Sequence, residues 1–122
     1  MSDSLAEYIE VIEAGYEFLL AYAAQGRESD EGQGGSEVRT TLTGMSKAAT
    51  EIIEYMTHDD NDFSTVIVED AKKSAAAISL VTGQSKISSE LVDNLNASIH
   101  LRALLTDLFL LSETLGSDAA IP

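Results

Sequence analysis

Residues 3–24 read DSLAEYIEVIEAGYEFLLAYAA, and their apolar positions recur at alternating spacings of four and three. This is the spacing of one face of a helix, and it predicts a helix over residues 4–24. Its main seam consists of Leu5, Ile9, Ile12, Tyr16, Leu19 and Ala23. A second seam beside it consists of Tyr8, Val11, Gly15, Phe18 and Tyr22. Two adjacent seams make about half of the circumference apolar, so we expect this helix to contact at least two neighbours.

Three further stretches have the same periodicity. They predict helices over residues 36–57, 64–81 and 88–115, with Ser36 and Ser88 or Ser89 as N-caps. The only proline is Pro122, so no interior position is closed to a helix by proline. The sequence therefore predicts an all-α protein: a single domain over residues 1–122, built as an up-down-up-down four-helix bundle.

Residues 25–36 separate the first two predicted helices. They read QGRESDEGQGGS, with four glycines and no apolar residue. A polar, glycine-rich segment of this length predicts a flexible, solvated loop, acidic in character and longer than a helical hairpin needs.

The last predicted helix changes its apolar face along its length. Leu91, Leu95 and Ile99 share one side, and a leucine series beginning at residue 101 lies on another. At ~1.5 Å per residue this helix is longer than the first two, so its leucines are predicted to overhang the bundle and to pair with a second copy. The alternative is a kinked helix that folds back over its own core. The predicted interaction residues are Leu101, Leu104, Leu108, Leu111 and Leu115, together with Tyr8, Phe18 and Tyr22 of the first helix.

Charge and composition exclude several classes of function. The 122 residues hold 21 Asp and Glu against seven Lys and Arg, a formal net charge of −14, and no cysteine. Direct binding of nucleic acid or of an anionic membrane is disfavoured, because both depend on clustered Lys and Arg. No stretch reaches the ~20 apolar residues of a membrane span, and no secretory signal is visible, so we expect a cytoplasmic protein. The acidity favours solubility or a salty host; the alternative is an acidic face for a basic protein partner, including nucleic-acid mimicry.

Metal-binding patterns are weak in this sequence. Glu54 and His58 are four residues apart on one helical face, and Asp59, Asp60 and Asp62 follow them. These five residues are the only candidates for a metal site, and they fail the calcium-loop pattern because residues 65 and 71 are Thr and Ala. We therefore predict no resident metal and no cofactor.

Two partial resemblances suggest alternative activities. The acidic pairs Glu10–Glu13, Glu51–Glu54 and Glu69–Asp70 resemble those of all-α, magnesium-dependent nucleotide pyrophosphohydrolases, but Lys72 replaces the expected second-helix acid. A bundle histidine such as His100 resembles the acceptor of phosphotransfer domains, but Leu-Arg follows it where Lys-Gly is usual. The leading prediction is therefore a non-catalytic interaction or regulatory module, an adaptor or inhibitor that forms a homodimer. The alternative is a bundle that binds a metal or a small molecule, including the two activities above. The sequence identifies neither the partner nor the pathway.

Overall fold

The computed structural model describes residues 3–32, 35–59 and 61–120, with side chains described between residues 4 and 114 of these ranges. All regular structure in this part of the chain is helical. The helices are α1 (Asp3–Ala24), α2 (Glu37–Thr57), α3 (Asp62–Thr82), α4 (Ser89–Ala97) and α5 (Ile99–Ala120). The prediction of an all-α fold is confirmed. None of the described helices is long and apolar enough to cross a membrane.

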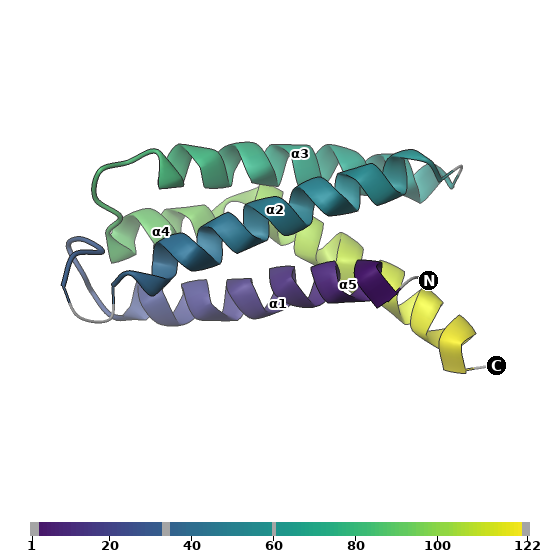
Figure 1. The fold of residues 1–122 in the computed structure, drawn as a ribbon, viewed down its shortest axis with the longest axis horizontal. Coiled ribbons are helices and arrows are strands. Elements are labelled where there is room, and N and C mark those ends of the chain that lie inside the picture. The colour runs from purple at the N-terminus through teal and green to yellow at the C-terminus, as the bar shows by residue number, and fades with distance from the viewer. Residues whose placement is uncertain (1–2, 33–34, 60, 121–122) are drawn as a thin grey trace.

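The helices lie side by side around one core (Figure 1). α2 packs between α1 and α3, while α4 packs mainly on α1 and α5 mainly on α3. The segment between α1 and α2 (described at residues 25–32 and 35–36) and the segment between α3 and α4 (residues 83–88) meet at one end of the molecule, which we call the loop end. The short turn between α2 and α3, described at His58, Asp59 and Asn61, lies at the opposite end with the start of α1, and we call this the turn end. The last turns of α5 extend beyond the other helices there.

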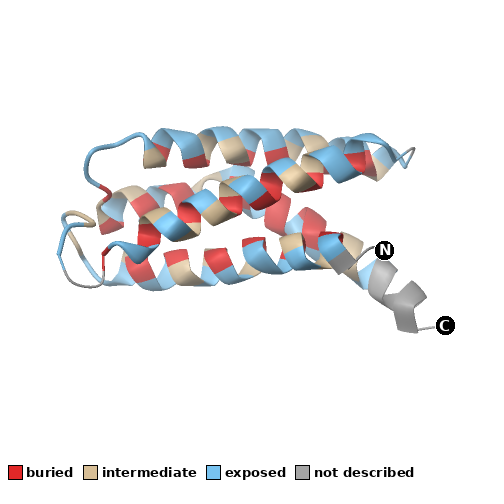
Figure 2. Ribbon diagram, viewed as in Figure 1, coloured by how far each residue is buried: buried red, intermediate tan, exposed pale blue. Residues whose placement is uncertain are grey.

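The predicted seams form the interior (Figure 2). Every seam position of α2 is buried, namely Val38, Leu42, Met45, Ala49, Ile52 and Met56. In α1 the main seam is buried at Leu5, Ile9, Ile12 and Leu19. The second seam of α1 is mixed, because Tyr22 is fully buried whereas Val11 is 41% exposed. The period of apolar residues therefore predicts the inner face of each helix well and its width less well.

Gly15 explains how closely α1 and α2 approach. A Cβ atom at this buried position would lie 2.5 Å from both Cγ and Sδ of Met45. Carbon and sulfur cannot approach to that distance, so only glycine accommodates Met45 here without movement.

The chain from Ser89 to Ala120 forms two helices, so the prediction of one continuous fourth helix is wrong. Ser98 has an extended conformation, with φ −64° and ψ 142°, and ends α4. A single straight helix could not bury both Leu95 and the later leucines, because they lie on different faces. The break solves this conflict: Leu95 stays buried on α4, Ile99 becomes 73% exposed, and α5 turns Leu101 inward. The predicted kink corresponds to this break.

One predicted cap differs from the structure, because Ser36 makes no side-chain capping hydrogen bond to α2. α3 begins two residues earlier than predicted, and its N-cap is Asn61, whose Oδ1 accepts a hydrogen bond from the Phe63 amide at 2.8 Å. The Ser88 cap of α4 is confirmed, with its Oγ accepting from the Leu91 amide.

Candidate functional site

The predicted interaction leucines lie inside the protein. Leu101, Leu104 and Leu108 are fully buried in the core, Leu111 packs against it, and the side chain of Leu115 is outside the described residues. Of the predicted aromatic contacts on α1, Tyr22 is fully buried, and Tyr8 and Phe18 are partly buried against the same core. The leucine series that motivated a dimer is therefore already covered by the protein's own helices.

α5 also has exposed apolar side chains at two positions that lie between the buried Leu108 and the partly buried Leu111. Phe109 is 54% exposed and Leu110 is 55% exposed. Leu110 stands at the mouth of a pocket of about 600 Å³ at the turn end. The pocket is lined by Leu5, Tyr55, Met56, Asp59, Asn61, Phe63, Ser64, Ile67, Leu110, Leu111 and Thr114. This turn-end pocket is an open, largely apolar hollow among the described residues.

Four helices, α1, α2, α3 and α5, build the turn-end pocket. Its floor is core material, because Leu5 of α1, Met56 of α2 and Ile67 of α3 are all buried. Its rim includes Tyr55 of α2, which is 41% exposed, and Leu110 of α5. α5 packs on α3 and extends past the turn end (Figure 1), and its Leu110, Leu111 and Thr114 line the pocket together with residues of α1, α2 and α3. Sequence periodicity treats each helix separately and therefore gives no sign of it.

Two polar side chains of the α2–α3 turn each accept a backbone hydrogen bond. Asp59 Oδ1 accepts a hydrogen bond from the Asn61 amide at 3.2 Å, and Asn61 Oδ1 accepts from the Phe63 amide. These contacts hold the turn and the first turn of α3. The two side chains that line the pocket here therefore shape it, and the remaining lining is dominated by apolar side chains.

The predicted metal candidates surround this turn without converging. Glu54, His58, Asp59 and Asp62 are exposed, and Asp60 lies outside the described residues. Among the residues that the structure describes, no three His, Asp or Glu side chains are grouped so that they could hold a metal ion. His100 is exposed at the start of α5, and its backbone carbonyl accepts a hydrogen bond from Ser74 Oγ.

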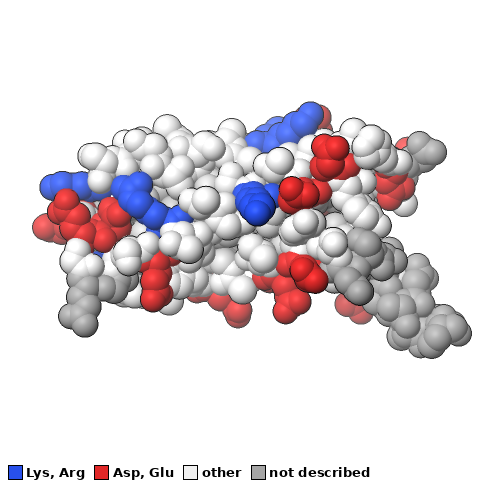
Figure 3. Space-filling view, viewed as in Figure 1, with Lys and Arg blue, Asp and Glu red and all other residues white. Residues whose placement is uncertain are grey.

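Charge is distributed very unevenly between the two parts of the chain. Segments 1–26, 48–71 and 103–122, which supply every lining residue of the turn-end pocket, contain fifteen acidic residues and no Lys or Arg. The remaining segments, residues 27–47 and 72–102, contain six acidic residues and all seven basic residues. On the face drawn in Figure 3, the turn end displays acidic side chains, and the basic ones lie towards the middle and the loop end. The segments that line the turn-end pocket therefore carry a net negative charge.

A second carboxylate feature lies between α3 and α5. Asp107 is 9% exposed, and its Oδ2 has no hydrogen-bond partner among the described residues. Burial, and then the hydrogen bond and charge of Asp70 on α3, raise the pKa of Asp107 to about 7. Below about pH 7, Asp107 therefore keeps a proton beside Asp70, where α5 packs on α3. The adjoining surface hollow is lined by Ile99, Arg102, Ala103 and Thr106.

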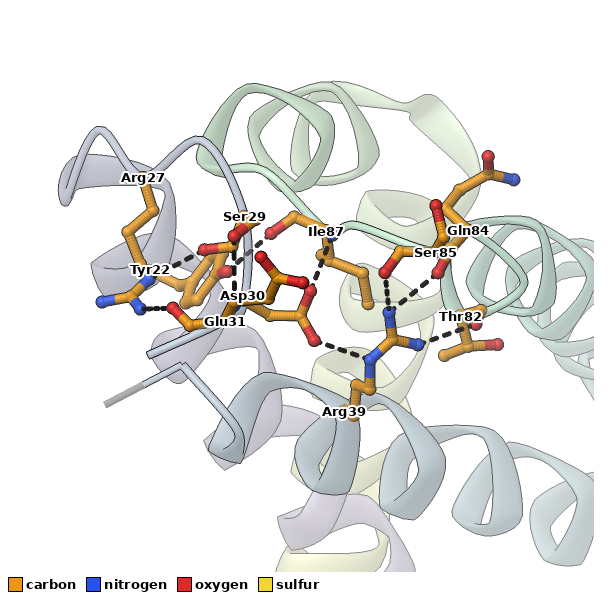
Figure 4. A network of polar contacts seen from close by, with 10 residues as sticks. All are labelled: Tyr22, Arg27, Ser29, Asp30, Glu31, Arg39, Thr82, Gln84, Ser85 and Ile87. Atoms are coloured by element: carbon orange, nitrogen blue, oxygen red, sulfur yellow. Dashed lines mark hydrogen bonds and ion pairs between the residues drawn. The ribbon is translucent and has the colours of Figure 1, made fainter. Parts of the chain in front are cut away.

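The loop end is closed by a polar network, shown in Figure 4. Asp30 is its centre: Oδ2 pairs with Nε of Arg39 at 2.6 Å, and Oδ1 accepts from the Ile87 amide at 2.9 Å. The guanidinium of Arg39 also donates to the carbonyl oxygens of Thr82, Gln84 and Ser85. The Arg39 side chain holds the pKa of Asp30 below its usual range. The contacts tie residue 30 of the glycine-rich segment to the chain before α4, while flexibility of segment 25–36 stays a prediction.

Tyr22 extends the same network into the core. Its hydroxyl donates to the Ile87 carbonyl at 2.6 Å, and its own carbonyl accepts from Ser89 Oγ at 2.7 Å. Burial raises the pKa of the Tyr22 hydroxyl. Tyr22 thus connects α1 to the start of α4, which is a structural task and not the predicted contact with a second copy.

Comparison with known protein families, with curated proteins and with solved structures finds no match for this chain.

Proposed function

We propose that this chain is a non-catalytic protein–protein interaction module that receives part of another protein in the turn-end pocket. Its scaffold is an up-down-up-down four-helix bundle in which α4 and α5 share the fourth position. One observation carries the proposal: a hollow of about 600 Å³ with a buried apolar floor opens beside the exposed side chains of Leu110 and Tyr55. Apolar surface of this kind, rimmed by polar residues, is characteristic of interaction sites.

The lining of the pocket also favours binding over catalysis. Its carboxylate and its amide, Asp59 and Asn61, accept backbone hydrogen bonds of the turn. A catalytic acid or base needs a free proton-accepting or proton-donating atom facing the substrate. The pocket therefore offers shape and apolar area, with few groups free for chemistry.

The test compares three immobilised proteins: wild type, Leu110→Glu and Leu80→Glu. Leu80 is 69% exposed on α3, away from the pocket lining, so it is a matched control. In soluble extract of the native host, we expect a protein that is retained by wild type and by Leu80→Glu and is lost on Leu110→Glu. Retention of the same proteins on all three, or of none on wild type, would contradict the proposal.

Homodimerisation is a second candidate, favoured by a different observation. Phe109, next to Leu110 but outside the pocket lining, leaves an aromatic side chain half exposed on α5. Two such faces meeting about a two-fold axis would cover both rings. Light scattering at micromolar concentration should then give a dimer that Phe109→Glu converts into a monomer. Since each copy carries a net charge of −14, added salt should strengthen this dimer. A wild-type monomer at all salt concentrations would exclude it.

A further inference from the structure

We propose that the occupant of the turn-end pocket is a basic amphipathic helix of a partner protein, with apolar side chains in the pocket and Lys or Arg side chains against its rim. This inference rests on the proposed function, because it specifies the partner of the same pocket. The apolar lining and the charge distribution together favour a partner segment of this kind.

The size of the pocket sets the apolar part of the partner. A cavity of ~150 Å³ holds a benzene ring, so about 600 Å³ has room for several apolar side chains. Side chains at i, i+3 or i+4 and i+7 of a helix present such a cluster on one face. The buried floor at Leu5, Met56 and Ile67 supplies the complementary apolar surface.

The rim sets the charged part of the partner. Glu51 and Tyr55 are four residues apart on one face of α2, and Asp59 follows in the turn after this helix; Tyr55 and Asp59 both line the pocket. Glu113 follows Leu110 by three residues on exposed positions of α5. The segments that form the pocket contain no Lys or Arg to neutralise these carboxylates. A cationic partner therefore lowers the repulsion between the rim carboxylates as it binds, and the negative field steers it to this end.

The same charges argue against a second copy in this pocket. An isologous contact of two turn ends would bring together two surfaces that are formed by segments without Lys or Arg. Like charges in an interface oppose association. The segments outside the pocket carry only one more basic than acidic residue, so another copy offers no strongly cationic surface to the rim. A basic segment of a different protein meets both requirements.

The experiment uses three helical probe peptides of about four turns. They share one leucine-rich face and carry Lys, Gln or Glu at every other position. Calorimetric titration of the full chain should show the Lys peptide binding at least ~10-fold more tightly than the Gln peptide at about 50 mM salt, with the difference shrinking at about 300 mM. The Glu peptide should not bind.

Variants of the full chain locate the binding. Leu110→Glu should weaken binding of the Lys peptide and of the Gln peptide equally, and Tyr55→Gln replaces this variant if it loses its helical circular dichroism. Leu80→Glu should weaken binding of neither peptide. Glu51→Gln combined with Asp59→Asn should remove the preference for the Lys peptide and leave binding of the Gln peptide intact. The control variant is Glu90→Gln, at an exposed position of α4.

The outcomes separate this inference from the proposed function. Equal binding of the Lys and Gln peptides, both lost on Leu110→Glu, would overturn the basic partner and leave the interaction module standing. Binding of the Lys peptide that ignores Leu110→Glu would show a diffuse electrostatic contact and overturn the inference. If no peptide binds but a small uncharged amphiphile such as octanol saturates the pocket, the site belongs to a small molecule and both proposals fail.

Discussion

Raising the pH from about 5 to about 8 is expected to lower the free energy of unfolding by roughly 2–3 kcal/mol, because the carboxyl group of Asp107 must ionise inside the protein. Its pKa in the folded protein is about 7, against 3.8 for an unperturbed carboxyl group. Between these values the folded state binds a proton that the unfolded state has released. The stabilisation that comes from Asp107 is therefore fully present below a pH of 3.8 and is lost as the pH rises through about 7.

The substitution Asp107→Asn tests this directly. The amide has nearly the same shape and can donate to Asp70, but it carries no charge at any pH. Urea unfolding should show the variant to be more stable than wild type at pH ~8, with little dependence on pH between about 5 and 8. Asp93→Asn, at an exposed carboxylate of α4, should keep the slope of wild type. A wild-type protein that gains stability over this range would contradict the assignment.

Replacing Arg39 with methionine is expected to cost about 2 kcal/mol of stability. Methionine keeps the apolar stem and removes the guanidinium, so the Asp30 carboxylate, 11% exposed, loses its ion pair and keeps the hydrogen bond from the Ile87 amide. The carbonyl groups of Thr82, Gln84 and Ser85 also lose a donor. Their partial access to water limits the loss, because the Arg39 side chain itself is 38% exposed.

The pH dependence of this variant provides a second readout. Arg39 lowers the pKa of Asp30, so the ion pair stabilises the protein above the ordinary carboxyl pKa and the stabilisation is lost as the pH falls. This is opposite in sign to Asp107. In urea titrations, the Arg39→Met variant should therefore be less stable than wild type at neutral pH, and the two free energies of unfolding should become equal in acid. Lys47→Met, an exposed position of the same helix, should match wild type throughout; an equal loss in both would contradict the role of the network.

Periodicity predicted the helices because it reports which residues face a common interior. The α2 seam from Val38 to Met56 is buried at every position. The same reasoning misplaced the leucines from Leu101 to Leu108, because it assumed a straight helix whose second face had to lie outside. Ser98 carries no strong breaker signal, so the end of α4 depends on packing against α1 and α3 rather than on local preference.

The candidate site could be anticipated only in part. The absence of Lys and Arg from segments 1–26, 48–71 and 103–122 is readable in the sequence. That these segments meet around one hollow depends on the packing of α5 on α3 beside the turn end, which no single segment encodes. The pairing of Asp30 with Arg39 and of Asp70 with Asp107 likewise joins residues whose partners are set by tertiary contacts.

The break at Ser98 also divides the cooperativity of the molecule. Helix hydrogen bonds propagate order along a chain, and the extended residue interrupts that propagation between α4 and α5. α4 is secured to α1 through Ser89 and Tyr22, whereas α5 depends chiefly on α3. The outer turns of α5 can therefore fray or rearrange as a separate unit, with the loop end undisturbed. Local opening at one end of this protein need not approach the energy of global unfolding.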